Sequence, residues 1–238
     1  YNTYNANGKE ELMRSISPYF AIILRTLIFI ILFALGVPSH SIKAQGYSQT
    51  GEYHSPHDAF GGPQKGQIAP NATLKTLDGK TVNLSEYIGK RPLVLIFGSL
   101  TCPIFRGKHS SMETLYAKYD SEAAFLLIYT VEAHPKGDIC PYTGREWVTD
   151  SNEQSGILYR QPVNEVERRE LADKARSNLS IKVPVLIDSM DNNAWQSYGK
   201  APNCAYLIGV DGRIKLRQGW FKPGEFEQIL LRELNSFH

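Results

Sequence analysis

Continuous apolar runs alternate with amphipathic stretches along most of the chain, from about residue 69 to the end. Three of these runs have the length of strands that are buried on both faces of a sheet: residues 92–97, 123–130 and 184–188. Apolar residues at helical spacing predict helices over residues 109–119, 164–178 and 223–234, with a helical turn at 194–198. Because a helix separates the first two runs, we expect a right-handed, parallel strand–helix–strand unit.

Two antiparallel hairpins flank this unit. Asp78-Gly79 is a tight-turn dipeptide between two short alternating stretches, and Asp211-Gly212 lies in the second turn. The hairpins pair residues 73–77 with 81–84 and residues 205–209 with 213–217. Together these elements predict an α/β domain, a mixed sheet flanked by helices. Their order resembles that of thioredoxin-like domains.

An apolar segment dominates the first 45 residues. Residues 18–37 are almost all apolar apart from Arg25, and basic residues precede them. If translation starts at Met13, the segment has the pattern of a signal peptide. If it is not cleaved, it predicts a single N-terminal membrane anchor, although Arg25 costs about 2.5–3.5 kcal/mol within a span. Both interpretations predict that the rest of the chain is exported to the extracytoplasmic, or periplasmic, side of a membrane.

The remainder of the chain divides into a linker and one globular domain. Residues 46–68 are rich in Gly, Ser, Pro and His and predict a flexible linker, and residues 69–238 form the domain. Within the domain, residues 135–162 are a long irregular insertion, which is typical of a functional or moving segment. Charged residues of the helix at 164–178 are interpreted as a solvated face: Glu167, Arg168, Arg169, Glu170 and Lys174.

Charge and cysteine content narrow the function. The net charge is +2, from 26 basic and 24 acidic residues without a basic stripe, so nucleic acid is not an expected partner. His54 and His57 have no further ligands at metal spacing, so no metal is expected. The three cysteines, Cys102, Cys140 and Cys204, cannot all pair within one chain, which leaves at least one thiol for chemistry.

Cys102 is the strongest candidate for a catalytic nucleophile. It follows the first buried strand, in the sequence GSLTCP, and precedes the first helix. Free amides and the positive dipole end at a helix start favour the thiolate. Phe105 stands where a second cysteine would be needed for Cys-x-x-Cys exchange, which excludes that reaction. Ser99 fits a peroxiredoxin motif but Leu95 replaces its proline, so an exported peroxiredoxin-like thiol peroxidase remains an alternative.

Three segments resemble the iodothyronine deiodinase family, over roughly residues 85–235: residues 91–105 (RPLVLIFGSLTCPIF), 125–135 (FLLIYTVEAHP) and 186–199 (LIDSMDNNAWQSYG). The resemblance implies reductive removal of iodine from aromatic substrates such as iodothyronines. It puts Cys102 at the family's selenocysteine position, His134 at its catalytic histidine and Glu132 at the nearby acid. An imidazole that titrates near neutrality suits a general acid. The resemblance also implies an external thiol as reductant, without a bound cofactor.

We expect a substrate pocket around the nucleophile, formed by Ser99, Thr101, Pro103, Phe105, Pro202 and Asn203. Pro202 lies where thioredoxin folds keep a cis-proline. The chain also departs from the family. Sulfur replaces selenium at Cys102, Leu100 and Val183 replace the auxiliary cysteines, and Asn203-Cys204 replaces a Glu-Arg pair that grips substrate. Weak activity on iodinated hormone is therefore expected.

Cys140 and Cys204 are the candidate resolving thiols. Cys140, in the insertion, is preferred because a flexible loop can carry it over the site, which predicts a Cys102–Cys140 disulfide after mild oxidation. A free loop thiol and a Cys140–Cys204 disulfide stay open as alternatives. The expected partners are a small-molecule substrate, a thiol reductant or thioredoxin-like donor, and the membrane through the N-terminal segment. A homodimer, and a non-enzymatic module that keeps only the fold, also remain open.

Overall fold

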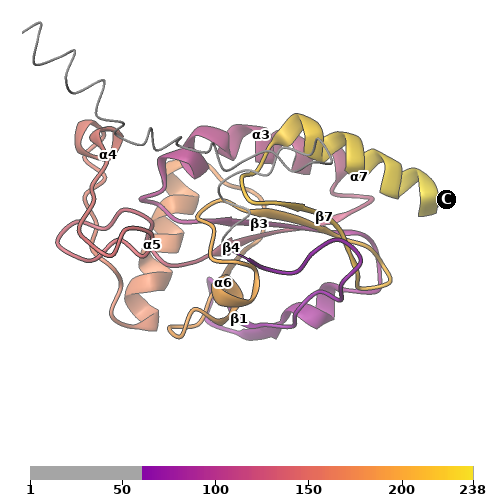
Figure 1. The fold of residues 1–238 in the computed structure, drawn as a ribbon, viewed down its shortest axis with the longest axis horizontal. Helices are drawn as coiled ribbons and strands as arrows, with labels where there is room; N and C mark the ends of the chain where they lie inside the picture. Colours follow the sequence, from indigo (N-terminus) through magenta and orange to yellow (C-terminus); the bar gives the residue numbers. More distant parts are fainter. Residues whose placement is uncertain (1–60, 238) are drawn as a thin grey trace, which may run out of the picture. The chain divides into compact units, whose positions relative to one another are not determined.

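The computed structural model of the chain describes residues 61–237 (Figure 1). The apolar segment predicted within the first 45 residues, and most of the predicted linker, lie outside the described residues. Within residues 61–237, no helix is both long enough and apolar enough to cross a membrane.

Seven strands form one mixed sheet in the order β2-β1-β5-β4-β3-β6-β7. Their bounds are β1 Thr73–Thr76, β2 Thr81–Asn83, β3 Leu93–Gly98, β4 Ala124–Tyr129, β5 Val185–Ile187, β6 Ala205–Ile208 and β7 Ile214–Gln218. β3, β4 and β5 are parallel neighbours, while β1, β2, β6 and β7 join the sheet by antiparallel pairing. The predicted parallel unit and both predicted hairpins are confirmed.

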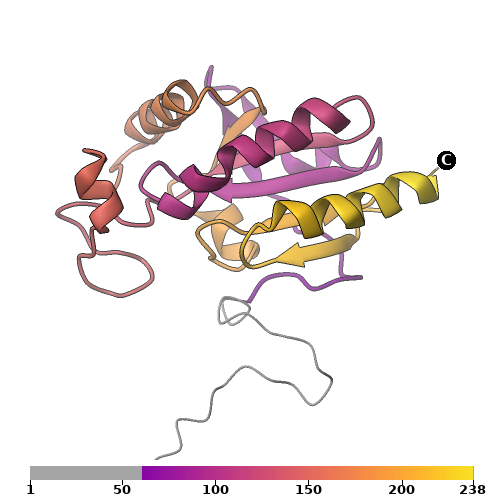
Figure 2. The same cartoon turned by 90° about the horizontal axis from the view of Figure 1, so that it is seen from above.

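Helices cover both faces of the sheet. The helices are η2 Leu84–Tyr87, α3 Pro103–Tyr119, α4 Asp150–Gln154, α5 Glu165–Asn178, α6 Asn193–Ser197 and α7 Pro223–Phe237. Side chains of α3, α5 and α7 form one core with alternate residues of the central strands. The other face packs against α6 and η2. Figure 2 shows α3 and α7 side by side along the sheet.

Two expectations about the helices need correction. α3 begins at Pro103, six residues before the predicted start at His109, because Cys102 caps it and the polar residues of its first turns conceal its buried face. Arg168 on α5 is not solvated: it is 3% exposed. Its guanidinium turns inward and donates to Asp188 O at 3.3 Å, which explains its burial.

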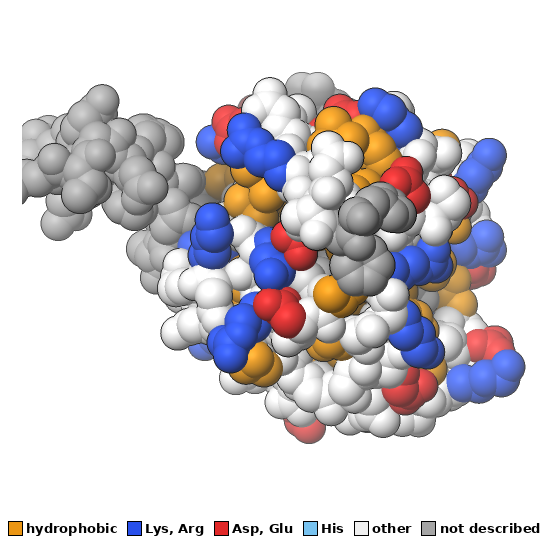
Figure 3. Space-filling model, turned by 90° about the vertical axis from the view of Figure 1, so that its right-hand side faces the viewer, with side chains coloured by type: hydrophobic (Ala, Val, Ile, Leu, Met, Phe, Trp, Pro, Cys, Tyr) orange, Lys and Arg blue, Asp and Glu red, His pale blue; other side chains and the backbone are white. Residues whose placement is uncertain are grey.

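The insertion between β4 and α5 lies beyond the carboxyl ends of the central strands, on the same side as the start of α3 (Figures 1 and 2). It contains α4, which the sequence did not predict. The described end of the predicted linker, residues 61–68, runs beside β7, where Gly66 N donates to Ile214 O at 2.8 Å. Figure 3 shows Lys, Arg, Asp and Glu side chains interspersed on the opposite end of the molecule.

Candidate active site

Cys102 caps the N-terminus of α3 directly after β3. Its sulfur accepts a hydrogen bond from Phe105 N, 3.4 Å away. Pro103 occupies the first turn of the helix, where a missing N–H leaves no helical bond unmade. The Phe105 ring packs so closely on Gly98 that a Cβ at Gly98 would lie 2.5 Å from it. The end of β3 and the first turn of α3 therefore fix the position of the sulfur together.

The loop before Cys102 is hydrogen bonded to the segment that follows β4. Ser99 Oγ accepts from Ala133 N at 3.2 Å, and Thr101 Oγ1 accepts from His134 N at 3.1 Å. Because β3 and β4 are parallel neighbours, their carboxyl ends meet at the same edge of the sheet. The fold thus brings the backbone of the segment carrying Glu132 and His134 against the cysteine loop.

Glu132 is completely buried and holds the cysteine loop. Its carboxylate accepts a hydrogen bond from Thr101 N at 2.8 Å and another from the Tyr129 hydroxyl. Burial raises the pKa of Glu132, and the hydrogen bonds from Tyr129 and Thr101 oppose that rise. Among the described residues, no hydrogen bond joins this carboxylate to the imidazole of His134. Glu132 is therefore positioned to order the loop before Cys102.

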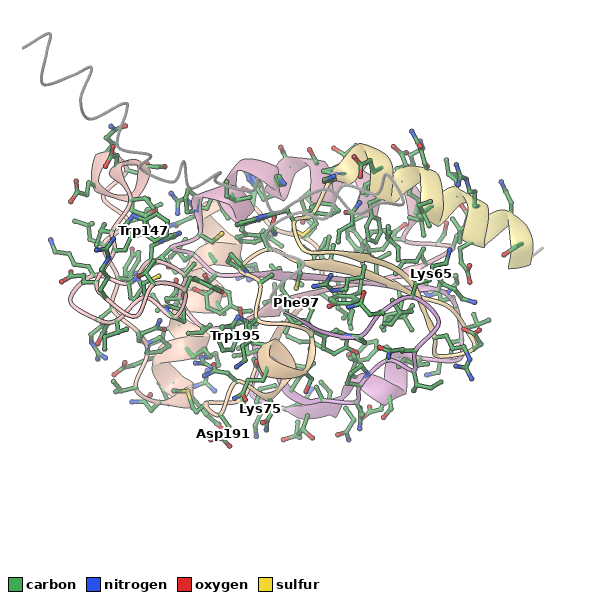
Figure 4. The ribbon with its side chains drawn as sticks, viewed as in Figure 1. Lys65, Lys75, Phe97, Trp147, Asp191 and Trp195 are labelled. Atoms are coloured by element: carbon green, nitrogen blue, oxygen red, sulfur yellow. The ribbon has the colours of Figure 1, made fainter. Side chains whose placement is uncertain are left out.

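His134 lies under Trp147 of the insertion. The two rings meet edge to face, with centroids 4.4 Å apart, and His134 is 8% exposed. Figure 4 shows Trp147 at the end of the molecule that the insertion occupies. Burial lowers the pKa of His134, which favours the neutral imidazole. Its Nδ1 is buried and has no hydrogen-bond partner among the described residues.

Cys102 is only 1% exposed, so its sulfur is shielded from solvent in this arrangement. Burial raises the pKa of Cys102 to about 11, although the amides of Phe105 and Ile104 and the charge of Arg106 act to lower it. The predicted amides at the helix start are present, but desolvation outweighs them. The closed site therefore holds a protonated thiol near neutral pH.

The other two cysteines are also free and buried. Cys140 donates a hydrogen bond to Ala133 O at 3.1 Å, so it is anchored beside the segment that carries His134, whereas the sequence predicted a swinging loop. Cys204 lies in the core on the opposite face of the sheet from Cys102. Burial raises the pKa of Cys204 to about 12. Cys140 thus contacts Ala133 of the core that contains Cys102, while Cys204 belongs to the opposite core.

Most residues expected to line a substrate pocket are packed. Pro103 is partly exposed and the others are buried: Ser99, Thr101, Phe105, Pro202 and Asn203. The cis-proline expected at Pro202 is wrong, because residues 61–237 contain no cis peptide bond. The chain enters β6 through Asn203, whose side chain donates to Phe97 O at 3.0 Å and whose carbonyl accepts from Phe221 N at 2.8 Å. The buried Oδ1 of Asn203 has no partner among the described residues.

Neither of two hollows in the described surface contains Cys102. One, of about 40 Å³, is lined by residues of β1 and α5, among them Lys75 and Arg169. The other, of about 360 Å³, lies between the end of the insertion and α5, with Tyr159 and Lys174 in its wall. No group of three or more His, Cys, Asp or Glu side chains within residues 61–237 is arranged to hold a metal.

Arg106 and Asn152 complete the surroundings of Cys102, and the sequence pattern did not reveal them. Arg106 donates to Leu100 O at 2.7 Å and to Asn152 Oδ1 at 2.8 Å. Asn152 is fully buried on α4 and donates to Thr101 O at 2.9 Å. A single arginine in a helix start and a single asparagine in an insertion carry no periodic signal, so only their distant partners show their role.

Residues 53–234 match the model of the family described as iodothyronine deiodinase. The chain is 31% identical over 170 residues to type I iodothyronine deiodinase of Xenopus laevis, covering 69% of this chain and 62% of that protein. It is 31% identical over 177 residues to thyroxine 5-deiodinase of Ovis aries, covering 74% of this chain and 56% of the relative. The chain therefore spans about three-fifths of the length of these curated relatives.

Solved structures show the fold. A protein assigned as a thiol:disulfide interchange protein in Chlorobium tepidum superposes with a TM-score of 0.50 at 20% identity, covering 72% of this chain and 99% of its own. A second protein, assigned as a protein disulfide isomerase in Bacteroides thetaiotaomicron, superposes with a TM-score of 0.51 at 17% identity, covering 73% of this chain and 91% of its own. The domain thus has the thioredoxin-like fold, and because the family model covers most of the sequence, the chain belongs to the iodothyronine deiodinase family.

Proposed function

We propose that the chain is a deiodinase-like thiol oxidoreductase that removes iodine reductively from aromatic substrates such as iodothyronines. One observation carries the proposal: the loop before Cys102 is hydrogen bonded to the segment that holds Glu132 and His134. This junction supports a nucleophile and a proton-transfer group that act together at one edge of the sheet. Membership of the family supports the substrate class.

In the proposed reaction, the Cys102 thiolate attacks iodine, and the carbon–iodine bond breaks as a sulfur–iodine bond forms. The electron pair of the broken bond stays on the ring carbon, which takes up a proton delivered through His134. An external thiol then attacks Cys102 sulfur, so that iodide leaves and a mixed disulfide forms. A second thiol reduces this disulfide. In sum, one aryl iodide and two thiols give the deiodinated ring, iodide, a proton and one disulfide.

Glu132 and Cys140 have supporting roles in this proposal. Glu132 fixes the Thr101 amide and hence the loop that carries the nucleophile. Cys140, bonded to Ala133 O, is the internal thiol that reduces an oxidised Cys102 when external thiol is scarce. Mild oxidation with hydrogen peroxide should therefore give a Cys102–Cys140 disulfide in peptide maps. Finding only Cys102 sulfinate, or a Cys140–Cys204 bond, would contradict this role.

The main test measures iodide release from an iodothyronine by the purified chain with dithiothreitol as reductant. Wild type should release iodide, and Cys102→Ser should not. Cys204→Ser is the matched control, because Cys204 lies in the opposite core and should be dispensable for release. Loss of hydrogen peroxide without iodide release would instead support the thiol peroxidase. Equal behaviour of wild type and Cys102→Ser in both assays would overturn both enzymatic functions.

A further inference from the structure

Arg106 carries a positive charge near Cys102 and forms no direct ion pair with a carboxylate among the described residues, although the buried Glu132 acts on both groups. Its guanidinium donates to Leu100 O at 2.7 Å, to Asn152 Oδ1 at 2.8 Å and to Ser151 Oγ at 3.4 Å, all of them neutral oxygens. In the described part of the chain, none of the ion pairs includes Arg106. A partly buried cation whose hydrogen-bond partners are neutral still acts electrostatically on a charged group that approaches the sulfur.

The insertion and α3 together hold this charge in place. Asn152 accepts from Arg106 and donates to Thr101 O at 2.9 Å, so the two joined side chains bind the carbonyls of two successive residues, Leu100 and Thr101. We call this arrangement the Arg106–Asn152 bracket. Asn152 is itself held by a hydrogen bond from its own N–H to Thr149 Oγ1 at 3.2 Å. Because the guanidinium is bonded both to Leu100 O and to Asn152 Oδ1, its position beside the cysteine loop is fixed.

Other charged and titratable groups face Cys102 from three elements. Lys108 on α3 is a second cation, and its Nζ donates a hydrogen bond to Phe221 O. Glu132, from the segment after β4, is the opposing carboxylate, but burial raises its own pKa. Tyr142 of the insertion is neutral, since burial raises the pKa of its hydroxyl. Two cations and one carboxylate therefore act on the sulfur, and Arg106 is the cation that is hydrogen bonded to the cysteine loop.

We infer that Arg106 is a specificity-determining residue, whose charge makes the Cys102 site prefer electrophiles that carry a carboxylate or another anionic group over neutral ones. The inference rests on the proposed function only in taking Cys102 as the nucleophile. An aromatic iodide with a carboxylate side chain belongs to the preferred class. The charge attracts the anionic group of the reagent and stabilises the attacking thiolate, and both effects weaken with added salt.

The test compares alkylation of Cys102 by iodoacetate and by iodoacetamide, followed by mass spectrometry of the Cys102 peptide. In both reactions the thiolate forms a sulfur–carbon bond and iodide leaves. The reagents are similar in size and differ by one negative charge, so the ratio of their rates reports the local charge and not the exposure of the sulfur. Arg106→Gln should lower the iodoacetate-to-iodoacetamide ratio by about three- to tenfold. Arg106→Lys keeps the positive charge and should therefore keep most of the wild-type rate ratio.

Two further variants separate charge from structure. Asn152→Ala opens the bracket but keeps the cation and its bond to Leu100 O, so both rates should rise together and the ratio should stay well above that of Arg106→Gln. Arg176→Met removes an exposed arginine that pairs with Asp173, and should change neither alkylation rate nor their ratio. An unchanged ratio in folded Arg106→Gln would overturn the inference. Should that variant not fold, a wild-type ratio that does not fall with added salt would overturn it. Because no deiodination is measured, this result is independent of the proposed activity.

Discussion

Replacing Arg168 with methionine should destabilise the domain strongly. Arg168 is 3% exposed, and its charge acts on Glu132 and Asp188, both buried carboxyls. Burial raises the pKa of each carboxyl, and Arg168 opposes the rise. Removal of the cation leaves two buried acids without its countercharge, which costs about 3–5 kcal/mol. For a domain of this size, 1 kcal/mol corresponds to about 2–4 °C, so Tm should fall by about 6–20 °C.

The pH dependence of this effect has a definite sign. A carboxyl whose folded-state pKa is raised stabilises the protein at low pH, and that stability is lost as pH rises through the folded pKa. Arg168→Met raises the pKa of Glu132 and Asp188 further, so the loss is greater in the variant. In thermal unfolding followed by circular dichroism, the Tm gap to wild type should be largest at pH 8 and shrink toward pH 5.

Arg176→Met provides the matched control for this experiment. Arg176 pairs with Asp173 at 2.7 Å on the same helix, but the two side chains are 44% and 53% exposed. Exposed pairs of this kind contribute about 1 kcal/mol or less, so Tm should barely change. If the difference in Tm between Arg168→Met and wild type is as small as that of the control, or stays constant with pH, then Arg168 does not compensate the two buried carboxyls.

Two other variants test the packing of the site. Gly98→Ala should cost about 2 kcal/mol in urea unfolding, because its Cβ would lie 2.5 Å from the Phe105 ring, and an unchanged midpoint would contradict that contact. Trp147→Ala should uncover His134 and raise the pKa of its imidazole toward the ordinary value, since burial is the main cause of the lowering. An NMR titration measures this pKa, and no change would show that Trp147 does not shield the ring.

The sheet could be predicted because its signals are local. Apolar runs of strand length gave β3, β4 and β5, and turn dipeptides gave both hairpins. The start of α3 was missed because Arg106, Gly107 and Lys108 interrupt the apolar face there. Pro103, a residue favoured in the first turn of a helix, was the signal that could have located it.

The charged and polar contacts of the site could not be predicted in this way. Arg168 lies in a run of charged residues, and only Glu132 and Asp188, distant in sequence, make it a buried cation. Asn152 has the appearance of an ordinary polar residue of a loop until Thr101 O is known to be its partner. Its place between a buried strand and a helix located Cys102, and the resemblance to a family assigned it a role. Neither indicated how deeply the sulfur is buried, because burial depends on where the insertion packs.

The insertion determines how the cysteine can react. With the pKa of Cys102 raised to about 11, far less of the thiol is ionised near neutral pH than of a free thiol. Desolvation causes this difference, and two residues of the insertion help to close the site, Trp147 over His134 and Asn152 on the cysteine loop. Movement of the insertion would admit water, while Arg106 and the amides of α3 would remain beside the sulfur because they belong to the helix. Movement of the insertion should therefore increase both the exposure of the Cys102 sulfur and the fraction of Cys102 that is ionised. Asn152→Ala, which frees the insertion from the cysteine loop and from Arg106, should then speed alkylation of Cys102 by more than the gain in exposure alone.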